Sequence, residues 1–197
     1  MEFVDVLDEY GNKTGIVKEH SLAKQDKNYT LAVHVWIMNH QGQILLQKRS
    51  LKKHTSPGMW DTTGGKVRAF ENSMEAIIRE TKEELGIDLS QEKLEYILRF
   101  PASKNIKPMF VDVYLLEKDI ELESLTLQKE EVDDVCYVPL STVKMWYLDN
   151  PNFVKQPYFL DILNRLEEKV YEYQENSSRV SSHQLLHSRK RGNLSRN

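Results

Sequence analysis

Apolar runs separated by turn residues organise the first half of the chain. Residues 2–7, "EFVDVL", and 15–20, "GIVKEH", flank a segment rich in Gly, Asn and Asp that favours a turn, so together they predict a β-hairpin. Residues 29–39, "YTLAVHVWIMN", are apolar at nearly every position, as in a central strand, and residues 44–50, "ILLQKRS", predict a second core strand. The Pro- and Gly-containing loop that follows allows a short strand around Trp60 to Thr62.

Strands and helices alternate in the second half of the chain. Residues 94–100, 109–117 and 133–140 have the apolar pattern of strands, whereas residues 141–148 and 157–173 have the pattern of helices. This interleaving favours an α/β or α+β domain in which helices pack on a mixed sheet.

The length of 197 residues allows one substantial core. Hydrophobic residues make up 40% of the chain and charged residues 29%, with a net charge of -3, which is the balance of a globular protein rather than a disordered or membrane protein. We therefore predict one domain over residues 1–174, with an accessory hairpin at 1–28 and a core at 29–170. Residues 175–197 are rich in Ser, Asn and Arg and predict a flexible basic tail.

The cellular compartment and the partners can be inferred from the start of the chain, its apolar runs, its single cysteine and its basic tail. The start, "MEFVDVLDEY", lacks the features of a secretory signal, and no apolar run reaches the roughly 18 residues of a spanning helix, so we expect a cytoplasmic protein without a membrane partner. The single cysteine, Cys136, fits a small apolar residue of a strand. The basic tail lacks interleaved aromatic residues, so we favour solvated chain over nucleic-acid binding there.

A helix with strong end signals follows the glycine pair at residues 64 and 65. Asn72 is a good N-cap, Glu75 completes a capping box, and Gly86 suits the left-handed position that ends a helix, so we predict a helix from Ser73 to Leu85.

The predicted helix separates apolar from acidic positions. At roughly 100° per residue, one side gathers Met74, Ile77, Ile78, Thr81 and Leu85, and another gathers Glu80, Glu83, Glu84 and the small Ala76. Like charges at these spacings destabilise a helix by roughly 0.2 to 0.5 kcal/mol per pair, and a divalent cation such as Mg²⁺ would turn that repulsion into binding. On spacing alone, a solvated acidic face is the simpler explanation.

The residues before and after the helix favour a functional site over a solvated acidic face. Gly65, Glu71, Arg79-Glu80, Glu83-Glu84 and Gly86 stand at the spacing GX5EX7REUXEEXGU, in which U is aliphatic, and all seven fixed letters match. The segment therefore resembles the Nudix box. Two positions depart from it, because Thr81 stands where an aliphatic residue is usual and Phe70 stands where a glycine is common.

The resemblance covers about residues 29–165 and implies a fold, a metal site and a reaction. The fold it implies is an α/β/α sandwich around a mixed sheet, here with the N-terminal β-hairpin as an extension. The metal site it implies binds Mg²⁺ or Mn²⁺ through the residues Glu80, Glu83, Glu84, Gly65 and Glu71. Arg79 would hold the carboxylates in place through charge-assisted hydrogen bonds. The Gly64-Gly65 pair would let the backbone turn sharply and approach the site.

The reaction it implies is attack of water on a nucleoside diphosphate linked to another group, with Glu80, Glu83 and Arg79 among the catalytic residues. A general base could lie in the box or on a later loop, where "QKEEVDD" offers Glu131, which we favour slightly, or Glu130.

Contacts to this small-molecule diphosphate could come from several basic and aromatic residues. Arg49 is the best candidate for binding phosphate, with Lys66, Lys52 and Lys53 weaker, although each could be an ordinary surface charge. Trp60 could stack on a base or pack in the core. For Trp36 and His34 we favour the core.

Three alternatives stay open. The opening hairpin, residues 32–39 and residues 45–61 look like the isopentenyl-diphosphate isomerase-like branch of the superfamily. The region before the box, however, lacks the isomerase cysteine, and Lys66 stands where that branch often has His. A non-catalytic module that binds a nucleotide or sugar would commonly lose box glutamates, which this chain keeps. RNA processing has only the Arg-rich tail in its favour. A homodimer is common in the family.

Overall fold

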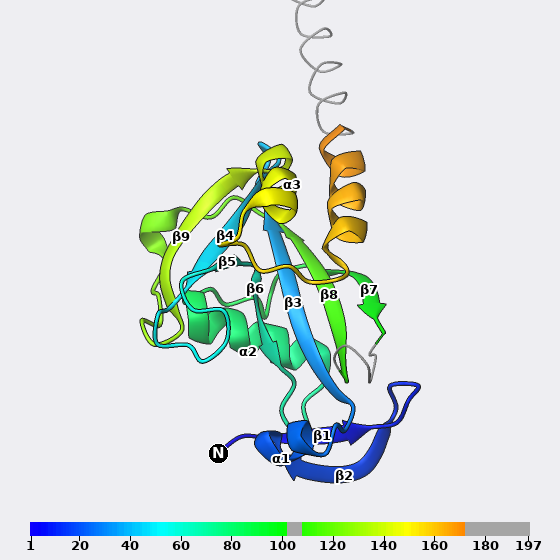
Figure 1. Ribbon diagram of the computed structural model, residues 1–197. Helices are drawn as coiled ribbons and strands as arrows, with labels where there is room; N and C mark the ends of the chain where they lie inside the picture. Colours follow the sequence, from blue (N-terminus) through cyan, green and yellow to red (C-terminus); the bar gives the residue numbers. More distant parts are fainter. Residues whose placement is uncertain (102–107, 172–197) are drawn as a thin grey trace, which may run out of the picture.

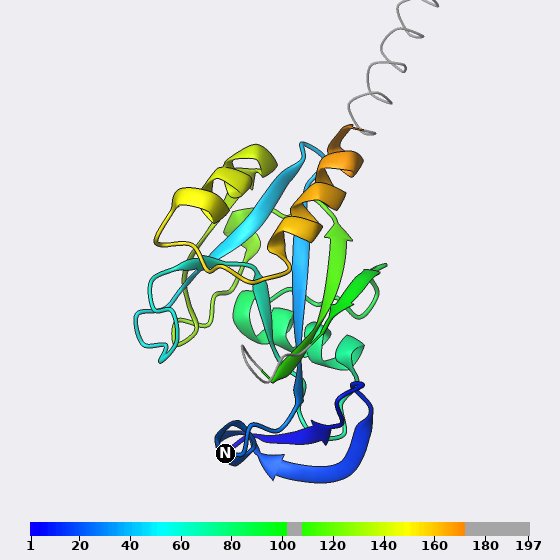
Figure 2. The same ribbon diagram turned by 45° about the vertical axis from the view of Figure 1, so that its right-hand side comes forward.

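The computed structural model describes residues 1–101 and 108–171. A mixed β-sheet forms its centre, with helices on both faces (Figures 1 and 2). Helix α2 (Ser73–Leu85) covers one face, whereas α3 (Leu140–Asp149) and a helix over residues 159–171 cover the other. The predicted α/β/α sandwich is confirmed.

Seven strands form the central sheet. Their order along the main path is β5-β4-β3-β8-β7, with β6 paired to β3 and β9 paired to β4. β3 and β8 run parallel, and the other recorded pairs are antiparallel. The bounds are β3 (Thr30–Met38), β4 (Gln43–Arg49), β5 (Trp60–Asp61), β6 (Thr63–Lys66), β7 (Glu95–Phe100), β8 (Met109–Glu117) and β9 (Val132–Pro139).

One edge of β3 is shared by two partners. Met38 near the end of β3 is opposite Ile44 of β4. Further back along the same strand, residues 32–35 are opposite residues 63–66 of β6. β6 therefore lies directly beside the central strand and leads the chain into the loop before α2.

Side chains of β3 alternate between two cores, as the period of a strand requires. Trp36 and Met38 belong to the cluster under α3 and residues 159–171, whereas Val35 and Ile37 belong to the cluster under α2. The Trp36 ring is fully buried and packs edge-on against Phe159, with ring centroids 5.0 Å apart. Trp36 is therefore a core residue.

The end signals of α2 are confirmed. The Asn72 side chain accepts a hydrogen bond from the Glu75 amide at 2.9 Å, and the Glu75 carboxylate accepts one from the Asn72 amide at 2.8 Å. Gly86 ends the helix with a φ of 76°. The predicted helix boundaries match the structure because both ends are fixed by local hydrogen bonds.

The predicted faces of α2 are partly wrong. Ile77, Thr81 and Leu85 are buried as predicted, and the Thr81 hydroxyl donates to the Ile77 carbonyl at 2.7 Å, so its polar atom is satisfied. Ala76, however, is fully buried in the core, while Met74 is 38% exposed. The sheet therefore covers an arc of the helix that is shifted towards the acidic side.

The glycine pair does not form the sharp turn that the sequence suggested. Gly64 and Gly65 lie within β6, and their φ angles are not in the left-handed region. The expected close approach is present, since a Cβ on Gly64 would lie 2.2 Å from the Val33 carbonyl oxygen. Glycine is needed at position 64 because a side chain would push β6 away from β3.

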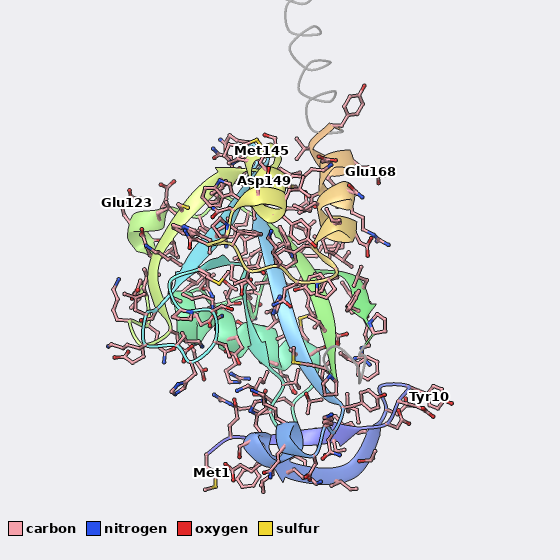
Figure 3. All side chains as sticks on the ribbon, viewed as in Figure 1. Met1, Tyr10, Glu123, Met145, Asp149 and Glu168 are labelled. Atoms are coloured by element: carbon pink, nitrogen blue, oxygen red, sulfur yellow. The ribbon has the colours of Figure 1, made fainter. Side chains whose placement is uncertain are left out.

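The predicted N-terminal hairpin is confirmed as a separate two-stranded sheet. Its strands β1 (Phe3–Leu7) and β2 (Lys13–Glu19) are antiparallel and lie at the lower end of the sandwich in Figure 1. Tyr10 in the turn points away from the body (Figure 3). The short helix α1 (His20–Gln25) and the 3-10 turn η1 (Leu122–Ser124) were not predicted from the sequence.

Two sequence predictions concern the remaining parts of the chain. The predicted basic tail at 175–197 and the last residues of the helix predicted at 157–173 lie outside the described residues. Across residues 1–101 and 108–171, none of the helices is long and apolar enough to span a bilayer.

Phe70, in the loop before α2, has a φ of 71° and is 84% exposed. An L-residue in the left-handed region is strained by roughly 1–2 kcal/mol, whereas glycine is not. The strain explains why a glycine is common at this position of the resembled motif.

Replacing Phe70 with Gly should therefore raise the free energy of unfolding by about 0.5–1 kcal/mol, because the relieved strain exceeds the extra freedom of glycine in the unfolded chain. Phe70→Ala is the matched control. It removes the ring but keeps the Cβ, and it should leave stability nearly unchanged. Urea denaturation of the three proteins measures this, and a less stable Phe70→Gly variant would contradict the explanation.

Candidate active site

The Arg79 guanidinium lies at the centre of the acidic cluster. Its Nε and Nη2 atoms donate to the two carboxylate oxygens of Glu71 at 2.7 and 2.9 Å, which is a bidentate pair. Its Nη1 lies 2.8 Å from Glu80 Oε1 and 3.2 Å from Glu83 Oε2, and Nη2 also donates to the Lys66 carbonyl at 2.9 Å. One cation thus joins three box carboxylates to the end of β6.

Arg79 and Glu71 shift each other's pKa values through hydrogen bonds and opposite charge. Burial alone would lower the pKa of Arg79, but hydrogen bonds and charge from Glu71 and Glu80 outweigh it and raise the pKa. Burial would likewise raise the pKa of Glu71, but hydrogen bonds from Arg79 and the Arg68 amide lower it. Glu71 is therefore an ionised anchor for Arg79 and for the loop before α2.

Glu80 lies directly against Gly65. A Cβ on Gly65 would lie 2.2 Å from the Glu80 carboxyl carbon, so the absent side chain is what makes room for the carboxylate. The Glu80 side chain is only 13% exposed, and burial, opposed by Arg79, raises its pKa. Gly65 and Glu80 thus form one feature, a carboxylate placed against open backbone.

The predicted exposed acidic face is wrong at Glu84. Its side chain points under the sheet, and the residue is only 4% exposed. Gln47 on β4 donates from Nε2 to Glu84 Oε2 at 2.9 Å, and Thr63 in turn donates to Gln47 Oε1 at 3.2 Å. Burial, with a further contribution from the Glu80 charge, raises the pKa of Glu84 to about 7. The site therefore contains a carboxyl group that titrates near neutrality.

Gln47 is a site residue that the sequence analysis missed. It is 2% exposed, and it lies in a strand whose preceding residues, Ile44, Leu45 and Leu46, are apolar. A polar residue at the end of an apolar run was the available signal, but its partner is 37 positions away along the chain.

Glu83 is the most accessible box carboxylate, with its side chain 41% exposed. Arg68 donates to both of its oxygens at 3.4 and 3.3 Å, and Arg79 holds it from the other side. Glu83 therefore lies at the rim of the cluster, where a ligand from solvent could reach it.

The loop acids differ in position. Glu131 forms an ion pair with Lys53, whereas Glu130 pairs at 3.6 Å with Lys52 and both of those side chains are about two-thirds exposed. Burial, then the Arg49 charge, lowers the pKa of Lys53, while charge from Glu84 and Glu80 opposes that shift. The Glu131 side chain is 33% exposed and the Glu130 side chain 69%, so Glu131 is the more enclosed of the two loop acids.

The predicted substrate contacts have protein partners. The Arg49 guanidinium donates to the Thr55 carbonyl at 3.1 Å and lies 3.6 Å from Asp61, so it shapes the loop after β4. Lys66 pairs with Glu2 of the N-terminal segment at 2.9 Å.

Trp60, His34 and Cys136 pack away from the acidic cluster. Trp60 packs against Trp146 on the α3 side, with ring centroids 6.1 Å apart. His34 is buried beside the Tyr158 hydroxyl, which agrees with the favoured core assignment. Cys136 is half-buried in β9, and burial raises its pKa to about 11.

The donor set fits a hard divalent cation, which prefers carboxylate and carbonyl oxygens. Glu80 and Glu84 carry raised pKa values that a nearby cation would lower, and the missing side chain of Gly65 lets the Glu80 carboxylate lie against the backbone of β6. Within the described residues, however, no three Asp, Glu, His or Cys side chains already converge as a metal centre. Arg79 holds Glu80 and Glu83, so metal binding requires them to reorient.

The raised pKa of Glu84 gives a stability prediction with a definite sign. A carboxyl group whose folded pKa is about 7 rather than 4.5 stabilises the metal-free fold when protonated, and this contribution is lost as pH rises from about 4.5 through 7. Relative to Glu84→Gln, wild type should lose up to about 3 kcal/mol across that range.

Chemical denaturation at a series of pH values, in the presence of a chelator, measures this difference. Saturating Mg²⁺ should counteract the loss in wild type and leave Glu84→Gln unaffected, because binding needs the ionised carboxylate. Parallel stability curves for the two proteins would contradict the assignment.

Comparison with known proteins agrees with this geometry. Residues 28–157 match the NUDIX domain family. Over 141 residues the chain is 40% identical to an uncharacterised Nudix hydrolase of Listeria innocua, covering 70% of this chain and 77% of that protein. Over 148 residues it is 42% identical to Nudix hydrolase 3 of Arabidopsis thaliana, but that match spans only 19% of the plant protein. An isopentenyl-diphosphate Delta-isomerase of Citrobacter koseri is 38% identical over 90 residues, covering 45% of this chain and 50% of the enzyme.

Solved structures give the same result. A Deinococcus radiodurans protein matches 84% of this chain and 99% of its own with a TM-score of 0.70, at 18% identity, which supports the fold alone. A MutT protein of Methanosarcina mazei matches 72% of this chain and 94% of its own with a TM-score of 0.54 and 26% identity. The family match, the Listeria relative and the Arg79-centred box together show that the chain belongs to the Nudix family.

Proposed function

We propose that this protein is a metal-dependent hydrolase that cleaves a diphosphate bond in a small, nucleotide-derived metabolite. The observation that carries the proposal is the arrangement around Arg79, which gathers Glu71, Glu80 and Glu83 beside the buried Glu84. Carboxylates gathered this closely, one of them buried with a strongly raised pKa, are typical of a functional site.

Mg²⁺ or Mn²⁺ would be held by Glu80, Glu83, Glu84 and the Gly65 carbonyl. When bound, the cation supplies charge neutralisation to the diphosphate and lowers the pKa of a bound water. Glu71 would serve the site as the anchor of Arg79, since both of its oxygens already accept hydrogen bonds from that guanidinium.

The chain's own residues would handle the proton and the substrate. The Glu131 carboxylate, held by Lys53 on the loop after β4, could accept the proton of the attacking water. Lys66 lies at the end of β6 beside the box and could attract a substrate phosphate. Arg49 and Trp60 stay predicted substrate contacts, although the partners described above give both a packing role.

The alternative of isomerase chemistry is less well supported. Such an enzyme needs a reactive thiol near the box, but Gly64 and Gly65 of β6 supply no side chain there. The single cysteine, Cys136, lies on β9 in the cluster covered by α3. Burial raises the pKa of Cys136 to about 11, which is the opposite of what an activated thiol requires. The kept glutamates likewise favour an enzyme over a module that only binds.

Location and partners stay predictions from the sequence. A cytoplasmic protein, a possible homodimer and a small-molecule partner agree with a metabolite hydrolase, and a nucleic-acid role would depend on the tail at residues 175–197.

Glu83→Gln tests the proposed activity most simply. With Mg²⁺ and a panel of nucleoside diphosphates and triphosphates, ADP-ribose, NADH, nucleotide sugars and isopentenyl diphosphate, wild type should hydrolyse some members. The variant should lose about 10²–10³-fold in kcat, because one metal carboxylate is neutralised while the fold is kept. Mass analysis of the products identifies the cleaved bond. Equal inertness of both proteins across the panel would contradict the proposal.

The two glycines of β6 give a matched pair of variants. Gly65→Ala meets the movable end of Glu80, so it should displace that carboxylate and reduce kcat about hundredfold with little loss of stability. Gly64→Ala meets the Val33 backbone, so it should instead destabilise the fold by about 2 kcal/mol or more. Thermal unfolding and steady-state kinetics of both variants separate these effects, and the reverse pattern would refute the placement of Glu80.

A further inference from the structure

The Glu2 carboxylate rests on two cations that border the box. Its Oε2 lies 2.9 Å from Lys66 Nζ, and its Oε1 lies 3.4 Å from Arg68 Nε. All three side chains are between 30% and 43% exposed, so solvent reaches the contact. Burial would raise the pKa of Glu2, but hydrogen bonds and charge from Lys66 and Arg68 outweigh it and lower the pKa. Glu2 is thus an ionised group paired with two accessible cations.

Both residues are also hydrogen-bonded to the box, Lys66 through its backbone and Arg68 through its side chain. The Lys66 carbonyl accepts a hydrogen bond from Arg79, and the Arg68 guanidinium donates to both oxygens of Glu83. A phosphate group near Glu83 would therefore find Arg68 and Arg79 as neighbouring positive charges, and Lys66 is joined to Arg68 through the shared Glu2 carboxylate. Arg68 belongs to none of the seven fixed positions of the box.

The Glu2 side chain is not what docks the hairpin. Three contacts hold the hairpin to the loop before α2 without it: the Ala69 amide donates to the Phe3 carbonyl at 2.8 Å, the Phe70 amide donates to Asp5 Oδ2 at 3.0 Å, and Lys13 Nζ donates to the Glu71 carbonyl at 2.9 Å. Loss of the Glu2 charge should leave these contacts in place. The carboxylate can then be tested as an electrostatic group in its own right.

We propose that Lys66 and Arg68 form a subsite for one phosphate of the diphosphate substrate, and that the Glu2 carboxylate competes with that phosphate for it. The proposal rests on the proposed function, because it assumes that the box receives a diphosphate. A carboxylate presents two anionic oxygens to the cations, as a phosphate would, and the phosphate carries more charge. The N-terminal hairpin thereby weakens substrate binding until a ligand displaces Glu2 from the two side chains.

Calorimetric titration of inorganic diphosphate in the presence of Mg²⁺ tests this through binding affinity rather than through a rate of hydrolysis. Glu2→Gln should bind diphosphate about fivefold more tightly than wild type at low salt, because it removes a competing charge at a partly exposed site. The difference should shrink at high salt, since salt screens exposed charges. Thermal unfolding of the variant verifies that the hairpin remains docked.

Glu9→Gln is the matched control. Glu9 precedes Tyr10 in the hairpin turn, and Tyr10 lies at the opposite end of the hairpin from Met1 (Figure 3). Glu9 makes no ion pair within residues 1–101 and 108–171. The Glu9→Gln variant removes one negative charge from the N-terminal hairpin region, as Glu2→Gln does, and should leave diphosphate affinity unchanged. Arg68→Gln introduced into Glu2→Gln should reduce the gain in affinity, because one of the two freed cations is then absent.

Several results would overturn the proposal: equal or weaker binding by Glu2→Gln, an equal gain in Glu9→Gln, retention of the full gain without Arg68, or no diphosphate binding by any of the proteins. Hydrolysis by wild type and Glu83→Gln is scored separately. Loss of hydrolysis in Glu83→Gln together with unchanged binding by Glu2→Gln would leave the proposed function standing and remove only the competing carboxylate.

Discussion

The repulsion among box carboxylates, and its neutralisation by Arg79, is the constraint on which the rest of the site depends. Glu71, Glu80 and Glu83 all contact one guanidinium, whose side chain is only 15% exposed. A partly buried cation needs hydrogen-bonded partners, and these carboxylates need a cation, so neither set is stable without the other. The bidentate Glu71 pair also fixes the loop before α2, so the same contact that balances charge aligns the helix with β6.

The sheet provides the second requirement, which is close approach. Since β4 and β6 share one edge of β3, β6 can run directly beside the central strand, and its glycines leave space on both sides. Gly64 allows contact with the backbone of β3, and Gly65 leaves room for the Glu80 carboxylate. On the other side of the cluster, Gln47 of β4 gives the buried Glu84 a hydrogen-bond donor. Residues from β4, β6 and α2 thus enclose one acidic cluster.

Local signals allowed much of this to be predicted. The capping box at Asn72 and the left-handed Gly86 fixed both ends of α2, and the run of apolar residues identified β3, because these features depend on near neighbours along the chain. The burial of Glu84 could not be predicted, since it depends on Gln47 in another strand. β6 was missed because two glycines indicate a turn more readily than a strand, and the partner of Lys66 was missed because Glu2 arrives from a separate hairpin.

The most direct test of a carboxylate-bound metal as the centre of the site is anomalous diffraction from crystals soaked in Mn²⁺. The account predicts a manganese peak coordinated by Glu80, Glu83 or Glu84, near the Gly65 carbonyl, with the Arg79–Glu71 pair intact. A manganese peak found only elsewhere on the protein would contradict the account. The absence of a peak at these carboxylates after soaking at a saturating Mn²⁺ concentration would contradict it too.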